Sequence, residues 1–205
     1  YSSGCMISLL SCNRQDFNIL TNASNPKPLH PKQALPPIPP LHGLDRLWVF
    51  LAVGLGSGLT PKAQGTSGSL AILLLVPLWV WLGFWPSMLL VLVMSVVGIP
   101  ICDKAARLMG VHDDGRIVWD EFAGQSIALL PLIYFGLVSD WNVASGFWVL
   151  AAFGLFRFFD VLKPWPISWL DAKVHGGFGI MLDDLVAGVM AAAVLLLGII
   201  FNMGG

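Results

Sequence analysis

The sequence predicts an all-α, polytopic helical membrane protein, and three observations lead to that fold class. Of the 205 residues, 56% are hydrophobic and 11% are charged, whereas average soluble domains carry about 25% charged residues. A net charge of −1 offers no basic surface for nucleic acid. Long segments contain no charged residue, namely 47–61, 69–102, 122–139, 141–156 and 185–205. We therefore expect about five transmembrane helices, and neither an ordinary soluble enzyme nor a nucleic-acid-binding protein.

The N-terminal 45 residues differ in composition from the rest of the chain. Seven of the 14 prolines lie between Pro26 and Pro40, separated by Asn, Lys and Gln. Such a segment cannot bury enough apolar surface to fold by itself. We expect residues 1–45 to form a disordered cytoplasmic tail and residues 46–205 to form one membrane-embedded domain.

The segment 47–60 is apolar, short and rich in glycine. It predicts a re-entrant or half-buried helix, with a sixth membrane-spanning helix as the alternative. Gly54 and Gly58 are four residues apart, a spacing that lets a neighbouring helix pack closely.

The uncharged segment 69–102 is too long for one span, because 34 helical residues would extend for about 51 Å. Gly83 and Pro86 break it, since proline does not continue a helix interior. We expect a helical hairpin of about 69–83 and about 86–102. Three tryptophans near its turn predict an aromatic belt at the membrane interface: Trp79, Trp81 and Trp85. The remaining spans are expected at about 121–138, 144–159 and 184–202.

The basic residues predict how these spans are oriented. Five spans starting at residue 69 place Lys62 and every later Lys and Arg on one side, while the loops 83–86 and 139–143 contain none. The positive-inside rule assigns that side to the cytoplasm. Fifteen of the 23 charged residues lie in 103–121 and 157–184, both on this face.

Two pairs of carboxylates stand where predicted spans begin. Asp120 and Glu121 open one span, and Asp183 and Asp184 open the last. Acidic caps at helix N-termini are one explanation. The other is a hard divalent cation, because Mg²⁺ prefers carboxylate oxygens and ionisable groups at the edge of hydrocarbon face a partner. These four residues are therefore candidate Mg²⁺ ligands, and no His/Cys cluster indicates zinc.

Arg157, Asp160 and Lys163 follow one another at three-residue spacing, which places them along one edge of a helix. They predict either a surface ion-pair ladder or a phosphate clamp, in which Arg157 and Lys163 hold phosphate oxygens and Asp160 binds metal or positions Lys163. His175, in a glycine-rich loop, adds a group that titrates near neutrality.

Residues 54–70 are rich in Gly, Ser and Thr and lead into a helix. Backbone N–H groups there can bind an anion, with Thr66 and Ser69 adding hydroxyl groups. The ending of a P-loop is absent.

These elements occur in one order, and together they resemble the phosphatidylglycerophosphatase A family of bacterial membrane lipid phosphatases. The segments that carry the resemblance are GSGLTPKAQGTSGSL (56–70), GVHDDGRIVWDEFAG (110–124), FRFFDVLKPWPISWLD (156–171) and VHGGFGIMLDDLVAG (174–188). The resemblance covers roughly residues 46–202. Gln64 departs from the family pattern, which usually has proline before Gly-Thr.

The resemblance implies Mg²⁺-dependent hydrolysis of phosphatidylglycerophosphate to phosphatidylglycerol and inorganic phosphate, at the cytoplasmic face of a bacterial inner membrane. We expect a water to attack phosphorus in line, with an aspartyl-phosphate intermediate as the alternative. The residues expected to be catalytic are Asp120, Glu121, Asp160, Lys163 and His175, with His175 protonating the leaving glycerol oxygen. The residues expected to bind the substrate are Thr66, Ser69, Arg157 and Lys163.

Other classes fit the sequence less well. Asp114-Gly115 is not followed by the Ala-Arg of the CDP-alcohol phosphotransferase signature, and the PSGH block of PAP2-type phosphatases is absent. A non-enzymatic transporter or channel subunit is the remaining alternative, but transporters carry acids near the bilayer midplane, whereas here every acid lies at a predicted membrane edge. The expected partners are the phospholipid substrate and the membrane, and a homo-oligomer is left open.

Overall fold

The computed structural model describes residues 37–111, 114–140 and 142–204. All regular elements in this part of the chain are helices, as predicted. Their order is α2 (Leu44–Ala52), η1 (Gly54–Leu59), α3 (Gln64–Leu73), α4 (Val76–Leu82), α5 (Phe84–Met109), α6 (Trp119–Tyr134), α7 (Val143–Leu162), α8 (Ile167–Lys173) and α9 (Gly176–Gly204). They belong to one compact unit, Ile38–Gly205. The predicted tail, 1–45, lies outside the described residues up to position 36.

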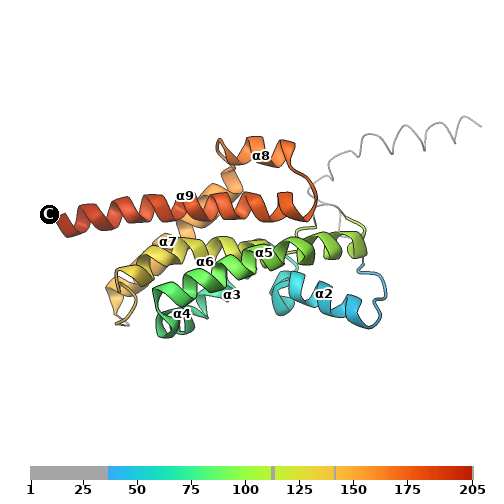
Figure 1. Cartoon of the computed structure of the whole chain (residues 1–205), viewed down its shortest axis with the longest axis horizontal. Coiled ribbons are helices and arrows are strands. Elements are labelled where there is room, and N and C mark those ends of the chain that lie inside the picture. The colour runs from blue at the N-terminus through green and yellow to red at the C-terminus, as the bar shows by residue number, and fades with distance from the viewer. Residues whose placement is uncertain (1–36, 112–113, 141, 205) are drawn as a thin grey trace, which may run out of the picture. The chain divides into compact units, whose positions relative to one another are not determined.

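Three of these helices are long and apolar enough to cross a membrane (Figure 1): α5 with 26 residues, α7 with 20 and α9 with 29. The prediction of about five spans is not confirmed. The expected span 69–83 is a pair of short helices, α3 and α4, bent by 43°, which together form a fourth candidate. The expected span 121–138 is α6, whose 16 residues extend for only about 24 Å.

The predicted break between the hairpin helices is confirmed. Helix α4 ends at Leu82, Gly83 has a φ of 75°, and α5 begins at Phe84. Pro86 therefore lies in the first turn of α5, where the missing N–H costs no helical hydrogen bond. Helix α5 continues seven residues beyond its expected end at 102 and stops at Gly110, a left-handed cap.

The segment 47–60 forms α2 and the 3₁₀-helix η1. At nine residues, α2 extends for about 14 Å and is too short to span a bilayer, so the structure favours the half-buried helix over a sixth span. Both glycines allow close packing, as expected. A Cβ on Gly54 would lie 2.7 Å from the Val118 side chain, and one on Gly58 would lie 2.2 Å from the Arg116 carbonyl oxygen.

Helix α6 lies at the centre of the bundle. It packs against α3, α5, α7 and α9, and nine of its 16 residues are buried. Where α6 crosses α9, a Cβ on Gly124 would lie 2.5 Å from the Asp184 carbonyl oxygen, and one on Gly188 would lie 2.3 Å from the Gly124 oxygen. The two backbones therefore touch, which brings the carboxylates of both helices close together.

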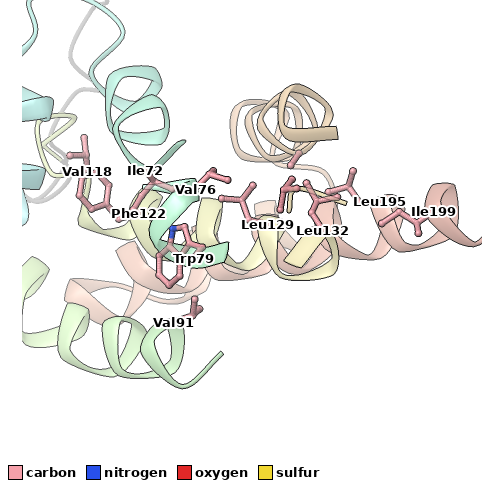
Figure 2. Close-up of a cluster of buried hydrophobic side chains, with 12 residues drawn as sticks. Ile72, Val76, Trp79, Val91, Val118, Phe122, Leu129, Leu132, Leu195 and Ile199 are labelled. Atoms are coloured by element: carbon pink, nitrogen blue, oxygen red, sulfur yellow. The ribbon is translucent and has the colours of Figure 1, made fainter. Parts of the chain in front are cut away.

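The apolar core runs along this bundle (Figure 2). Its largest cluster joins α3, α4 and α5 to α6 and α9 through Ile72, Trp79, Val91, Leu129, Leu132, Leu195 and Ile199, among others. Trp79 is buried here and does not join the expected aromatic belt, whereas Trp81 and Trp85 are exposed.

Candidate functional site

A cavity of about 520 Å³ lies where α3, α6 and α9 begin and α7 ends. Its charged lining consists of six carboxylates, two permanent cations and one imidazole: Asp120, Glu121, Asp160, Asp171, Asp183, Asp184, Arg157, Lys163 and His175. The structure therefore brings together every residue that the sequence predicts as catalytic or metal-binding. Thr66 and Ser69 do not line this cavity.

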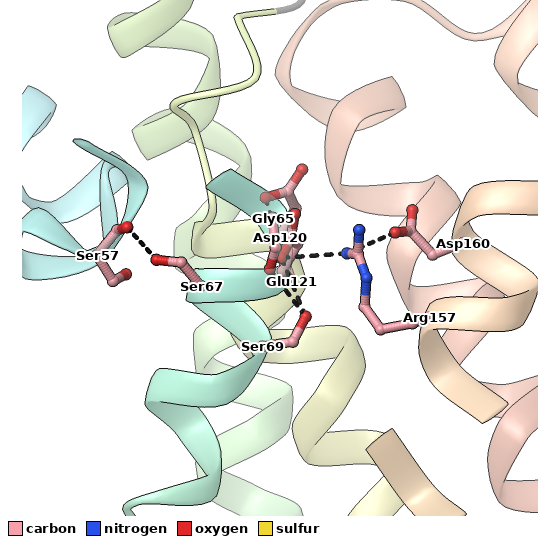
Figure 3. Close-up of polar contacts among 8 residues, drawn as sticks. All are labelled: Ser57, Gly65, Ser67, Ser69, Asp120, Glu121, Arg157 and Asp160. Atoms are coloured by element: carbon pink, nitrogen blue, oxygen red, sulfur yellow. Dashed lines mark hydrogen bonds and ion pairs between the residues drawn. The ribbon is translucent and has the colours of Figure 1, made fainter. Parts of the chain in front are cut away.

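The buried side of the cavity is organised around Arg157 of α7 (Figure 3). Arg157 Nη1 lies 2.7 Å from Asp160 Oδ2 and 3.4 Å from Glu121 Oε2. Ser69 Oγ donates a 3.0 Å hydrogen bond to Glu121 Oε2 and lies 3.1 Å from the Gly65 carbonyl oxygen. Gly65 leaves room for this carboxylate, because a Cβ there would lie 1.9 Å from Glu121 Oε1. Glu121 is thus held from two helices, α3 and α7.

Ser69 therefore contacts a carboxylate of the cavity and is itself fully buried. Thr66 lies in the first turn of α3, next to the lining residue Gly65. The substrate-binding roles expected of these two hydroxyls stay predictions. The position of Ser69 suits orientation of Glu121.

The more open side of the cavity is organised around Lys163. This residue ends α7 in the left-handed conformation, with a φ of 42°. Its Nζ lies 2.9 Å from Asp183 Oδ2 and 3.0 Å from Asp171 Oδ1. The expected ladder is therefore present only as the Arg157–Asp160 pair, because the change of backbone conformation directs Lys163 to other carboxylates.

Hydrogen bonds keep Lys163 and Asp171 charged. Burial by itself would lower the pKa of Lys163, but hydrogen bonds to Asp183 and Asp171 raise it above its ordinary value. Partial burial would raise the pKa of Asp171, but the hydrogen bond from Lys163 and the nearby His175 hold it below its ordinary value. Lys163 and Asp171 thus remain an ion pair at neutral pH.

The two predicted carboxylate pairs occupy different kinds of position. Asp120 and Glu121 lie in the first turn of α6, as expected. Asp183 and Asp184 do not open their helix, because α9 begins at Gly176 and places them about 11 Å along its axis. The helix dipole acts mainly within the first turn, so it does not explain their presence.

Asp183 and Asp184 are instead buried beside other acids. Asp184 interacts electrostatically with Asp120, Asp160 and Glu121. Asp183 Oδ1 and Asp184 Oδ2 are buried without a hydrogen-bond partner among the described residues. A buried carboxylate oxygen without a partner is costly, and a bound cation would satisfy these two.

The donor set meets the requirements of a metal ion only in part. Within the described ranges, no group of three or more His, Cys, Asp or Glu side chains is gathered closely enough to hold one. Arg157 and Lys163 bind several of the oxygens that a metal would use. The chemistry nevertheless fits Mg²⁺, since the donors are carboxylate oxygens and two of those oxygens lack partners.

Sequence reasoning missed three features of this region. Asp171 on α8 reaches Lys163 because the chain reverses at Pro164 and Pro166 before α8. The two prolines predict a turn, but they do not predict which side chain then contacts Lys163. Gln64 and Gly115 also line the cavity.

A buried ion pair holds the loop that carries Gly115. Arg116 Nε donates a 2.8 Å hydrogen bond to Asp114 Oδ1, and Arg116 Nη2 lies 2.5 Å from Asp114 Oδ2. The backbone N–H of Arg116 also bonds to Asp114 Oδ1 at 3.0 Å. This pair fixes the chain immediately before α6, and with it the approach to Asp120 and Glu121.

Comparison with known proteins gives this cavity a context. A family model described as phosphatidylglycerophosphatase A matches residues 50–199. The chain belongs to the phosphatidylglycerophosphatase A family. It is 48% identical over 151 residues to phosphatidylglycerophosphatase A of Escherichia coli (strain K12), a match that covers 72% of this chain and 81% of the relative. The corresponding Haemophilus influenzae protein is 46% identical over 147 residues, covering 71% and 85%.

The family resemblance stated from the sequence is thus confirmed, and the chain is a phosphatase. A third relative, a putative phosphatidylinositol-3-phosphatase of Bacteroides thetaiotaomicron, is 37% identical over 146 residues and covers 69% of this chain and 86% of its own length. No solved structure matches the chain. Membership of this family does not favour the transporter alternative.

Proposed function

We propose that the protein hydrolyses the phosphomonoester of phosphatidylglycerophosphate, giving phosphatidylglycerol and inorganic phosphate, with Mg²⁺ as cofactor. The observation that carries this proposal is a cavity that combines carboxylates and two cations at one end of membrane-crossing helices. The two relatives named phosphatidylglycerophosphatase A match more than two thirds of this chain.

The charge of the cavity supports the need for a divalent cation. Six carboxylates face two permanent cations, so the lining has a formal excess of four negative charges when all are ionised and His175 is neutral. A phosphomonoester at neutral pH carries up to two negative charges. Such a group enters only if positive charge offsets this excess.

We assign the Mg²⁺ ligands to the carboxylates of α6 and α9: Asp120, Glu121, Asp183 and Asp184. Mg²⁺, when bound, supplies positive charge that lowers the cost of bringing the phosphate into this cavity and of developing charge during the reaction. The contact between Ser69 and Glu121 supports a fixed orientation for one of these carboxylates.

The remaining residues of the cavity bind the phosphate and transfer protons. Arg157 and Lys163 provide N–H donors for the non-bridging oxygens of the phosphate. Asp160 orients the Arg157 guanidinium through their 2.7 Å ion pair. A carboxylate of the cavity orients the attacking water and accepts a proton from it, and His175, on the cavity wall, protonates the leaving glycerol oxygen.

The position of the cavity also suits a lipid substrate. It lies at the C-terminal end of α7 and the N-terminal end of α9, both long enough to cross a bilayer. The basic loops share this end, which makes it the cytoplasmic end under the positive-inside rule. We place the reaction at the lipid headgroups on the cytoplasmic face of a bacterial inner membrane.

The test is phosphate release by the purified wild-type protein from three short-chain lipids. We expect rapid release from phosphatidylglycerophosphate and slower release from phosphatidylinositol 3-phosphate and phosphatidate. No release from phosphatidylglycerophosphate, at any Mg²⁺ concentration, would contradict the proposal. Preference for phosphatidylinositol 3-phosphate would transfer the assignment to the activity named for the third relative.

A further inference from the structure

Helix α8 forms one wall of the cavity, although it is only seven residues long. It packs mainly against α9 and lies beside that helix rather than inside the bundle (Figure 1). Ile167, at its start, is fully buried in a cluster with Phe156 and Ala187. Asp171, one turn later, lines the cavity and accepts a hydrogen bond from Lys163. One face of α8 is therefore fixed to the catalytic region.

The other face of α8 carries exposed tryptophan. Trp169 precedes Asp171 by two residues, which places the two side chains about 200° apart around the helix axis. Trp169 is 55% exposed, and Trp165, in the turn before α8, is 79% exposed. Lys173 lies in the last turn of the same helix. Tryptophan with lysine on a short surface helix is typical of segments that lie in a membrane interface.

Exposed apolar residues also lie at the ends of α7 and α9 that adjoin α8 in the sequence. Val161 and Leu162, at the end of α7, and Phe178, at the start of α9, are exposed. These residues flank the cavity in sequence, since Asp160, Lys163 and Gly179 line it. Exposed apolar side chains on α7 and α9 therefore directly adjoin cavity-lining residues in the sequence.

We propose that α8 is an interfacial helix, in which Trp165 and Trp169 lie among the lipid headgroups and hold the cavity wall at the depth of a membrane-borne phosphomonoester. The occupant of this surface is the lipid bilayer itself. The kinetic part of the proposal rests on the proposed function, whereas the depth of α8 does not.

The depth of α8 is measured directly by spin labelling. The variants W165C and W169C are labelled one at a time in a chain whose native cysteines are replaced (C5S, C12S, C102A), and are reconstituted in nanodiscs that contain anionic lipid. We expect both labels to be more accessible to oxygen, and less accessible to a water-soluble nickel chelate, than a label at the exposed position K62C. Accessibilities equal to those at K62C would overturn the proposal.

The functional consequence is measured with a matched pair of double variants. W165S/W169S is compared with W81S/W85S, which removes two tryptophans of similar exposure, 80% and 70%, from the turn of the α4–α5 hairpin. For bilayer-borne phosphatidylglycerophosphate we expect W165S/W169S to raise KM about tenfold, the factor that about 1.4 kcal/mol gives. For a dispersed short-chain substrate we expect KM to stay unchanged, and W81S/W85S to leave both values unchanged.

The proposal would be overturned if W165S/W169S raised KM equally for both substrates, or raised it for neither. If W165S/W169S does not fold, the spin-label depths decide alone. If the wild-type protein releases phosphate from neither substrate, the proposed function fails, and the depths still decide where α8 lies.

Discussion

Two ion networks line opposite sides of one cavity, and they differ in how firmly they are held. Around Arg157, every charged side chain is at most 19% exposed, and the partners come from α6 and α7. Around Lys163, one partner, Asp183, is buried on α9, but the other, Asp171, is 51% exposed on the short helix α8. Arg157 and Lys163 were expected to act as one clamp.

This difference assigns different roles to Arg157 and Lys163, which the sequence predicts as parts of one phosphate clamp. A buried guanidinium held by two carboxylates has one geometry, which suits fixed orientation of a phosphate. A lysine between a buried and an exposed carboxylate can exchange the exposed one for an incoming anion, because an exposed ion pair contributes little stability. We therefore expect the Arg157 network to determine the rate and the Lys163 network to affect binding.

The largest effect is expected from removal of divalent cations. Both ion networks line the same cavity, so loss of its cation affects both. EDTA is expected to stop phosphate release completely, and added Mg²⁺ to restore it, because the excess negative charge of the lining then goes unbalanced. Phosphate release is measured before and after chelation, with EDTA presaturated with Mg²⁺ as the control. Full activity in EDTA would remove the metal from the proposed reaction.

R157K is expected to lower kcat roughly a hundredfold, since an ammonium cannot reproduce the planar fork of N–H groups that a guanidinium offers to phosphate oxygens. R107K is the matched control, because Arg107 pairs with Asp103 on the exposed surface of α5. Steady-state kinetics on short-chain substrate measure both variants. Equal, small effects of R157K and R107K would show that the buried network does not determine the rate.

S69A is expected to lower kcat about tenfold, the cost of losing one hydrogen bond to a charged group, with little change in KM. The control is S95A, which removes a hydroxyl that bonds only to the Val91 carbonyl oxygen within α5. If T66A has the larger effect, the anion-binding role predicted for this segment would replace the orienting role of Ser69.

The smallest effect is expected from D171N, and in the opposite direction. Removing the exposed carboxylate that competes with phosphate for Lys163 is expected to lower KM about threefold while kcat stays similar. D140N, which removes an exposed carboxylate from the loop between α6 and α7, is expected to leave KM unchanged. A large fall in kcat for D171N would mean that Lys163 depends on Asp171 for its position, and the comparison of the two networks would fail.

The composition and the breaks in hydrophobicity were sufficient to predict the fold class and the hairpin turn at Gly83. They could not predict that α6 is shorter than a span, because an uncharged segment in the centre of a bundle has the same composition as one that faces lipid. The close contact between Gly124 and Gly188 shows that α6 is buried against α9. The sequence does not show that these two glycines meet.

The charged residues of the site could be predicted, but not their pairings. Asp183 and Asp184 stand at the edge of an uncharged segment, so the helix was expected to begin there. It begins at Gly176, although glycine is a poor helix former. Close packing against α5 requires a glycine in this turn, because a Cβ on Gly177 would lie 2.3 Å from the Ile99 carbonyl oxygen. The contact between Lys163 and Asp171 depends on a left-handed residue and a proline turn, and neither specifies its partner in the sequence.

The account depends most on the claim that the carboxylates of α7 and α9 act in one site. The direct measurement is phosphate release from short-chain phosphatidylglycerophosphate by purified D160N and D184N, beside the wild type and D140N. Each site variant is expected to elute as the folded protein and to release no phosphate above background, while D140N, an exposed position, retains wild-type turnover. Wild-type turnover in both D160N and D184N would contradict the account.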